Sequence, residues 1–185
     1  MSTSDIDIPR VSEIIKLGGL VTGKSGNLSY RLSRDAYAVT VTGQDLRFLG
    51  DDSFVRKKLS DKQKGNASIE WRLHAFAYAA SPSAKAVFHF QPRYLTALSI
   101  LTRPPVDRLK GLLPETARYI KKIAVVDYAL PGSIALARGV REAIHRRADA
   151  LILRDHGAVV TGASVGDALH KAEAFEFAAR VLCTL

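Results

Sequence analysis

Short apolar runs and amphipathic stretches alternate along the chain, a pattern typical of a mixed α/β protein. A hairpin is predicted from residues 28–33 and 36–41, with Arg34 and Asp35 at its turn. Further buried strands are predicted at 84–90, 123–126, 150–153 and 158–160. Because helical patterns separate these runs, we expect one sheet with helices on both of its faces.

Helices are predicted where apolar residues recur every three or four positions. Ser68, Ser133 and Ser164 stand where N-caps are expected, ahead of three such stretches. The helix that begins at Ser68 is predicted to turn four residues toward the core, namely Ile69, Leu73, Phe76 and Ala80. Further helices are predicted near residue 11, from 93 to 101 and within 106–122, whereas 44–66 is predicted to be charged and irregular.

The composition is that of a globular protein, with 47% hydrophobic and 24% charged residues among 185. This length predicts a single domain over residues 1–185. The N-terminal residues lack the basic and apolar regions of a signal peptide, and no apolar run is long enough to span a bilayer. The single cysteine, Cys183, excludes an intrachain disulfide framework and a cysteine zinc cluster. We therefore expect a cytoplasmic protein without a membrane partner.

The formal net charge of +9 favours an anionic substrate or partner. Basic residues concentrate in the segment 56–64 and on the helix predicted after Ser133. Aromatic residues do not alternate with them, as they do in sites for single-stranded nucleic acid. A solvated basic surface is therefore the favoured interpretation, and nucleic-acid binding is not expected.

Two polar residues interrupt the apolar unit between 68 and 91. Glu70 lies at a predicted helix start and His89 near the end of a predicted strand, which are common positions for site residues. The alternative is that Glu70 interacts with the helix dipole and His89 is a core histidine. The loop 22–27 contains two glycines together with Lys24 and Asn27, so it is either an anion-binding loop or an ordinary polar turn.

Six motifs then occur in a characteristic order. They are SGNLS at 25–29, VTG at 41–43, SIEWRLH at 68–74, AVFHF at 86–90, YALPGS at 128–133 and RDHGAVVTG at 154–162. From about residue 11 to the last residue, the chain resembles the class II aldolase/adducin family, and its sugar-phosphate aldolases in particular. The resemblance implies a three-layer α/β/α fold around a central, largely antiparallel β-sheet. It also implies a homotetramer with its active sites at the subunit interfaces.

The resemblance further implies a divalent metal, usually Zn²⁺, with Mn²⁺, Fe²⁺ and Co²⁺ as alternatives. By position, His89 and His156 would bind this metal, and Gln91 replaces the second histidine of the family's His-x-His pair. Glu70 would be the catalytic acid/base, and Tyr128 would donate a proton in the site of a neighbouring subunit. Because an amide oxygen binds zinc less well than imidazole does, the site either holds metal through Gln91 or water, or has lost it.

The implied phosphate-binding residues are Gly26, Asn27, Thr42, Gly43 and Ser68. The next family position, often a serine, is Ile69, which makes a carboxylate substrate an alternative. His74 is interpreted as a packed polar side chain, with a hydrogen bond to a site residue as the alternative. A C-terminal tail covers the site in some aldolases, and we expect this chain to lack it.

The resemblance thus implies a metal-dependent lyase that cleaves a C–C bond of a small phosphorylated sugar or related hydroxycarbonyl through an enediolate. A decarboxylase or dehydratase working through the same site is an alternative within the enzyme class, because each reaction stabilises an enolate. A non-catalytic, adducin-like binding protein that has lost the metal is the alternative outside the enzyme class.

Overall fold

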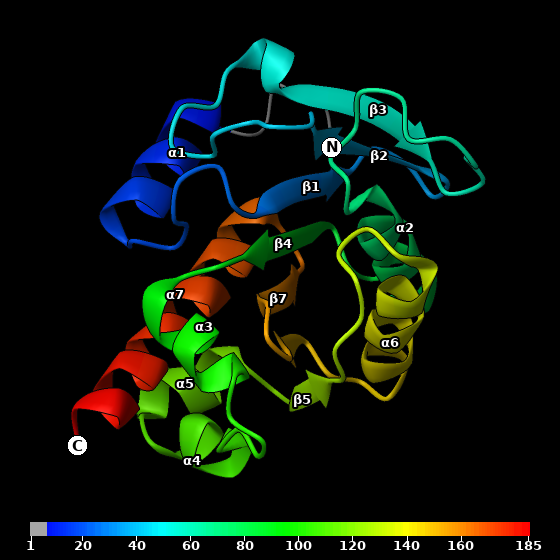
Figure 1. The fold of residues 1–185 in the computed structure, drawn as a ribbon. Helices are drawn as coiled ribbons and strands as arrows, with labels where there is room; N and C mark the ends of the chain where they lie inside the picture. The colour runs from blue at the N-terminus through cyan, green and yellow to red at the C-terminus, as the bar shows by residue number, and fades with distance from the viewer. Residues whose placement is uncertain (1–6) are drawn as a thin grey trace.

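Residues 7–185, which the computed structural model describes, form one seven-stranded sheet with the strand order β3-β2-β1-β4-β7-β6-β5 (Figure 1). The strands are β1 (Asn27–Arg31), β2 (Ala36–Thr40), β3 (Phe54–Lys58), β4 (Ala86–Phe90), β5 (Ile123–Val126), β6 (Ala150–Leu153) and β7 (Gly157–Gly162). All neighbouring strands are antiparallel except β5 and β6. The largely antiparallel sheet predicted from the sequence is confirmed.

Helices cover both faces of the sheet, and each face has its own hydrophobic core. The helices are α1 (Ile8–Leu17), α2 (Trp71–Ala80), α3 (Arg93–Ser99), α4 (Val106–Gly111), α5 (Pro114–Tyr119), α6 (Ile134–His145) and α7 (Val165–Thr184). One core contains apolar residues of α2 and α6, and the other contains those of α1, α3 and α7 (Figure 1). The three-layer α/β/α architecture is therefore confirmed.

Strand β4 lies in the middle of the sheet and sends alternate side chains to opposite faces. Phe88 and Phe90 belong to the core on the α7 side, whereas Val87 belongs to the core on the α2 side. His89, which is 1% exposed, therefore faces the α2 side near the end of the strand. One strand thus supplies both cores and one buried imidazole.

Two of the three predicted N-caps are observed. The Ser133 hydroxyl accepts a hydrogen bond from the backbone N–H of Leu136 at 3.1 Å, which starts α6. The Ser164 hydroxyl accepts from the N–H of Asp167 at 3.0 Å, which starts α7. These side chains satisfy amide groups that the first helical turn leaves without partners.

The predicted cap at Ser68 is wrong, because α2 begins at Trp71 with Glu70 in the N-cap position. The backbone N–H of Ser68 donates to the carbonyl of Thr40, which ties this residue to the end of β2. The predicted core face of α2 is also only partly right, since Ile69 is 55% exposed while Leu73 is buried. The helix lies between the sheet and α6, so it buries most of its circumference rather than one stripe.

The segment 44–66 is more regular than the sequence predicted. It contains a short 3₁₀ turn, Asp51–Ser53, and the edge strand β3, which pairs with β2. Charged side chains hide the strand pattern, because Lys57 is buried with its ammonium group 4.7 Å from the ring of Trp71. Likewise, the helix predicted within 106–122 is divided into α4 and α5, and Pro114 starts the second of them.

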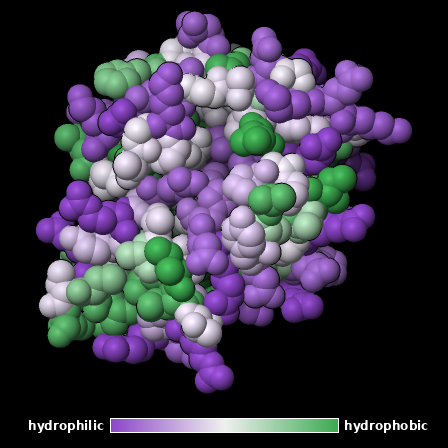
Figure 2. All heavy atoms as spheres, viewed as in Figure 1, coloured by the Kyte–Doolittle hydropathy of each residue, from purple (hydrophilic) through white to green (hydrophobic). Residues whose placement is uncertain are grey.

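On the face shown in Figure 2, hydrophilic residues cover most of the surface and the middle is hollowed. The largest hydrophobic group on this face lies over α3 and α5. Within residues 7–185, no helix combines the length and the apolar composition that a membrane crossing requires.

Candidate active site

Three ligand-type side chains from separate elements meet at one point. Glu70 stands at the N-terminus of α2, His89 on β4, and His156 in the turn between β6 and β7. Their potential ligand atoms all lie within 4.8 Å of one another, and Glu70 and His89 are buried. The imidazole rings of His89 and His156 are 4.7 Å apart at an angle of 69°. We call these three residues the Glu-His-His cluster.

The turn that carries His156 depends on an unusual backbone. Gly157 has a φ of 156°, and a Cβ at this position would lie 2.7 Å from the carbonyl oxygen of Phe90. Asp155, just before His156, has a φ of 53°. Because a side chain at 157 would push the turn away from β4, the glycine allows His156 to approach His89 closely.

The histidines of the cluster are neutral. His89 Nδ1 lies 3.0 Å from the carbonyl oxygen of Ala158, which can only accept a hydrogen bond, so Nδ1 carries the hydrogen. Its Nε2 is therefore left with a lone pair. Burial lowers the pKa of His89 to about 3, and burial also lowers the pKa of His156. Both imidazoles thus keep a lone pair that a metal can use.

Glu70 has the opposite shift. Burial raises the pKa of its carboxyl group to about 7, and the backbone N–H of Gly132 lowers this pKa in part. Its Oε1 lies 3.9 Å from His156 Nε2 and has no hydrogen-bond partner within residues 7–185. A carboxyl group that titrates near neutrality is suited to proton transfer.

The cluster fits a divalent cation. Glu70 Oε1 and His156 Nδ1 are enclosed side-chain atoms without hydrogen-bond partners in the described part of the chain, and such atoms are costly unless a ligand satisfies them. Two neutral imidazoles and one carboxylate form a donor set found in catalytic zinc sites. Gln91 follows β4 directly and lines the same cavity, so it is available as a further oxygen ligand.

A cavity of about 270 Å³ opens next to the cluster. Its lining includes all five residues that the resemblance assigned to phosphate binding, namely Gly26, Asn27, Thr42, Gly43 and Ser68. Lys24, Gln44 and Pro131 line it as well. The contributions of Gln44 and Pro131 were not predicted, since nothing in the local sequence shows that these loops face residues 22–27.

Several donors in this cavity are free to bind a ligand. Within residues 7–185, the backbone N–H groups of Gly26 and Gly43 make no hydrogen bond. The Ser68 hydroxyl oxygen accepts from the N–H of Glu70 at 3.3 Å, which leaves its hydrogen available. The fold therefore presents several hydrogen-bond donors in the lining of the cavity that holds the Glu-His-His cluster. Such an arrangement suits the oxygens of an anionic group.

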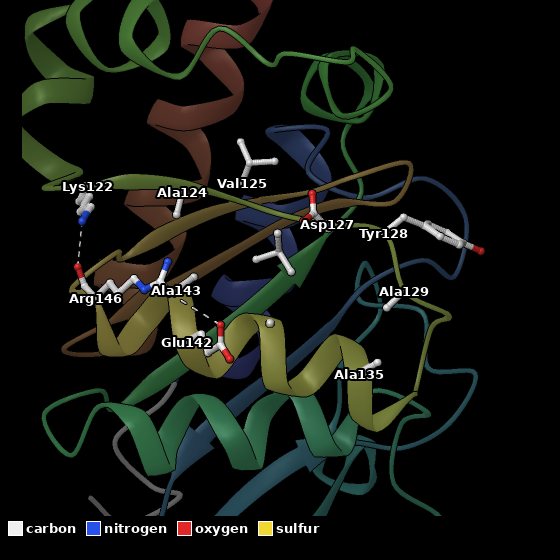
Figure 3. Close-up of a pocket in the computed structure, with 12 residues that line it drawn as sticks. Lys122, Ala124, Val125, Asp127, Tyr128, Ala129, Ala135, Glu142, Ala143 and Arg146 are labelled. Carbon is white, nitrogen blue, oxygen red and sulfur yellow. Dashed lines mark hydrogen bonds and ion pairs between the residues drawn. The ribbon is translucent and has the colours of Figure 1, made fainter.

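Tyr128 does not line this cavity. It follows β5, is 56% exposed, and borders a separate hollow of about 480 Å³ between β5 and α6. In Figure 3 its ring points outward, away from Lys122 and Arg146 at the other end of that hollow. Within one chain, Tyr128 is therefore not part of the cavity that holds Glu70.

His74 is buried, but it is more than a packed polar side chain. Its ring nitrogens lie 2.6 Å from Ser29 Oγ and 2.6 Å from Asn27 Oδ1. The alternative interpretation, a hydrogen bond to a site residue, thus matches the geometry with Asn27 as the partner. His145 and His170 are exposed.

Comparisons with known proteins identify the family of this chain and several relatives. Residues 7–183 match the model of the family described as "Class II Aldolase and Adducin N-terminal domain". An L-fuculose phosphate aldolase of Methanococcus maripaludis is 36% identical over 162 residues, which cover 87% of this chain and 86% of the relative. A 3-oxo-tetronate 4-phosphate decarboxylase of Haemophilus influenzae is 33% identical, with 97% and 89% covered.

Solved structures show the same likeness. The crystal structure of L-fuculose-1-phosphate aldolase from Thermus thermophilus superimposes with a TM-score of 0.84 at 26% identity. The match covers 96% of this chain and 91% of that one. The family match and the relatives above 30% identity lead to one conclusion: this chain is a member of the class II aldolase and adducin family.

Proposed function

We propose that this protein is a divalent-metal-dependent aldolase that cleaves a C–C bond of a small phosphorylated sugar. The observation that carries the proposal is the Glu-His-His cluster in the same cavity as a set of free hydrogen-bond donors. The cluster supplies a metal site and an acid/base, and the donors supply an anchor for an anion. Relatives named as sugar-phosphate aldolases support this choice of substrate class.

His89 and His156 would hold the cation, with Gln91 as a further ligand and Glu70 beside them. When bound, a divalent cation supplies a Lewis acid that withdraws negative charge from a substrate oxygen. We favour Zn²⁺ because imidazole is the main ligand type, while Mn²⁺, Fe²⁺ and Co²⁺ suit a site that includes an amide oxygen.

Glu70 would move the proton. It is the one carboxylate among the described residues that line the cavity, and its raised pKa matches a group that accepts and returns a proton near neutral pH. It would take the hydrogen of the substrate hydroxyl, so that a carbonyl forms and the C–C bond breaks. Gly132 N–H and the start of α2 would hold the carboxylate in place.

The anion end of the cavity would fix the position of the substrate. Gly26 N–H, Gly43 N–H, Asn27 and Ser68 would bind the phosphate oxygens, with Thr42 and Lys24 at the same end. Holding the phosphate fixes where the reacting carbons lie relative to Glu70. Part of the binding free energy then lowers the activation barrier of the reaction.

We also propose a cytoplasmic homotetramer in which Tyr128 serves a neighbouring copy. Tyr128 is exposed and does not line the cavity of its own chain, so a proton-donor role requires a second chain. The proposed site is then complete only at an interface between copies.

A decarboxylase is the second candidate. Relatives named 3-oxo-tetronate 4-phosphate decarboxylase are 32–33% identical and cover 94–97% of this chain. Loss of CO₂ from a 3-oxo acid also leaves an enolate, which the same groups would stabilise. A phosphorylated substrate is common to both candidates, so they differ in the bond that breaks. A dehydratase has no specific observation in its favour.

The test is a product assay with two substrates. Purified protein is incubated with L-fuculose 1-phosphate and, separately, with 3-oxo-tetronate 4-phosphate, while aldehyde and CO₂ are measured. Aldehyde release that Glu70→Gln abolishes supports the aldolase, and CO₂ release supports the decarboxylase. If the wild-type protein is instead found without metal, turns over neither substrate and behaves in these assays as Glu70→Gln does, that result would point to a non-catalytic binding protein.

A further inference from the structure

A row of four buried polar side chains runs beneath the anion end of the cavity. Tyr78 Oη lies 2.8 Å from Ser29 Oγ, and Ser29 Oγ lies 2.6 Å from His74 Nδ1. His74 Nε2 lies 2.6 Å from Asn27 Oδ1. All four residues are at most 5% exposed. The row ends at Asn27, which lines the cavity.

The hydrogen bonds in this row all run from donor to acceptor in one direction, from Tyr78 toward Asn27. Burial raises the pKa of Tyr78, so its hydroxyl keeps its hydrogen. Among residues 7–185, the one hydrogen-bond partner of this hydroxyl is Ser29 Oγ. Tyr78 can therefore donate only to Ser29. Ser29 in turn donates to His74 Nδ1.

His74 then carries its own hydrogen on Nε2. Burial lowers the pKa of His74 to about 3, so the ring is neutral and has one N–H. With Nδ1 accepting from Ser29, that hydrogen points at Asn27. The reverse direction would leave the Tyr78 hydroxyl hydrogen without an acceptor among residues 7–185, which a buried group avoids.

The orientation of Asn27 follows from this direction. Its Oδ1 accepts from His74, so its Nδ2 lies on the other side of the amide group. Nδ2 makes no hydrogen bond within the described residues, and it is not one of the enclosed atoms that lack a partner. It is therefore open to the cavity, with two N–H groups available. If the amide were flipped, Asn27 would instead present an oxygen that repels an anion.

We propose that His74 is a positioning residue, which holds the Asn27 amide with its N–H groups toward the cavity and thereby makes the site selective for anionic substrates. This inference rests on the proposed function, because it takes Asn27 as part of the substrate site. His74 touches no substrate and acts through Asn27 alone.

The first test reads the tautomer of His74 directly. Long-range ¹H–¹⁵N NMR spectra are recorded on the purified protein, either free of metal or loaded with diamagnetic Zn²⁺. We expect hydrogen on Nε2 and none on Nδ1. Hydrogen on Nδ1 would overturn the proposal, whatever the protein turns out to catalyse, because Asn27 would then be oriented the other way.

The second test compares His74→Leu with His74→Gln. The Gln side-chain nitrogen can replace Nε2 as a donor to Asn27, whereas Leu keeps the bulk and loses the donor. For His74→Leu we expect the inhibition constant of inorganic phosphate and the KM of the phosphorylated substrate to rise about tenfold or more, with kcat changed less. His74→Gln should recover most of the loss.

Circular dichroism and thermal unfolding establish that each variant is folded before binding is measured. Equal losses of kcat and of phosphate binding in the Leu and Gln variants would indicate a structural role and overturn the proposal. Wild-type protein that binds no phosphate would count against the proposed function instead, and the tautomer of His74 would then decide the orientation of Asn27 independently.

Discussion

Asn27 and His89 lie directly opposite each other on the neighbouring strands β1 and β4. One residue belongs to the anion end of the cavity and the other to the Glu-His-His cluster, so the backbones that carry them are about 5 Å apart, the spacing between strands. This distance suits a small substrate that carries its anionic group close to the reacting carbons. The sheet itself thus sets the size of the proposed substrate.

Metal content should depend on His89 and His156. We expect His89→Ala to weaken Zn²⁺ binding by about 100-fold or more, since even residues that merely support metal ligands are worth 10- to 100-fold. Gln91→His should strengthen binding, because imidazole is the better zinc ligand. Elemental mass spectrometry of protein purified without chelator checks both, with His170→Ala as an exposed control. Unchanged metal in His89→Ala would place the cation elsewhere.

The free energy of unfolding of the metal-free protein should depend on pH because of Glu70. The pKa of its carboxyl group is raised from 4.5 to about 7 in the folded state, so between these values the folded chain holds a proton that the unfolded chain has released. This group therefore makes stability fall as pH rises from 4.5 to 7, by about 3 kcal/mol in total. Urea unfolding across this range should show the fall in wild type relative to Glu70→Gln, and parallel curves for the two proteins would contradict the prediction.

Glycine at position 26 should be needed for both stability and binding. Gly26 has a φ of +81°, and a Cβ there would lie 2.7 Å from the backbone oxygen of His89. We expect Gly26→Ala to cost about 2–3 kcal/mol of stability and to raise KM. Gly23→Ala is the matched control, because its φ is +58° but nothing lies within 4 Å. Its cost should be about 1 kcal/mol. Equal losses in urea unfolding would mean that the contact with β4 does not matter.

Position 69 should tune affinity for the phosphate. Ile69 lines the cavity and is 55% exposed, so Ile69→Ser adds a hydroxyl group at little cost to the core. We expect KM for a phosphorylated substrate to fall several-fold, as one added hydrogen bond of about 1 kcal/mol implies. Ile134→Ser, at a similarly exposed position that does not line the cavity, should leave KM unchanged. An unchanged KM in Ile69→Ser would favour a substrate anchored elsewhere.

Sites shared between copies should allow two inactive variants to rescue each other. Tyr128→Phe and Glu70→Gln should each lose most of the activity. When the two are unfolded together and refolded as mixed oligomers, about a quarter of the wild-type activity should return, since some sites then pair an intact Glu70 with an intact Tyr128. No recovery in verified mixed oligomers would show that Tyr128 does not serve a neighbouring copy.

The sequence predicted the sheet well because its strands are short apolar runs with clear ends, as in β6 and β7. It failed where tertiary contacts override the local pattern. Ser68 does not cap α2, because its N–H bonds to Thr40, twenty-eight positions earlier in the chain. Strand β3 was not predicted, because Lys57 is buried against Trp71, and the local sequence does not indicate this contact.

The candidate site shows the same division. The residues that carry chemistry stood out as polar interruptions in apolar surroundings, as Glu70 and His89 do. The side chains that position these residues did not stand out in the sequence. The row that holds Asn27 joins side chains 45 to 49 positions apart, and its direction depends on the neutral state of a buried ring. Neither feature is visible in a linear pattern.

The alternation along β4 has a practical consequence for engineering. Because Phe88 and Phe90 fill one core while Val87 fills the other, a deletion of one residue within 84–88 would send His89 into the apolar layer beneath α7. Such a variant would lose its packed core and its catalytic site together. Libraries that aim to change the substrate range should therefore keep the length of this strand fixed. Their diversity belongs at loop positions such as 22–25 and 44, where changes leave the register intact and keep Gly26, Asn27 and Gly43 unchanged.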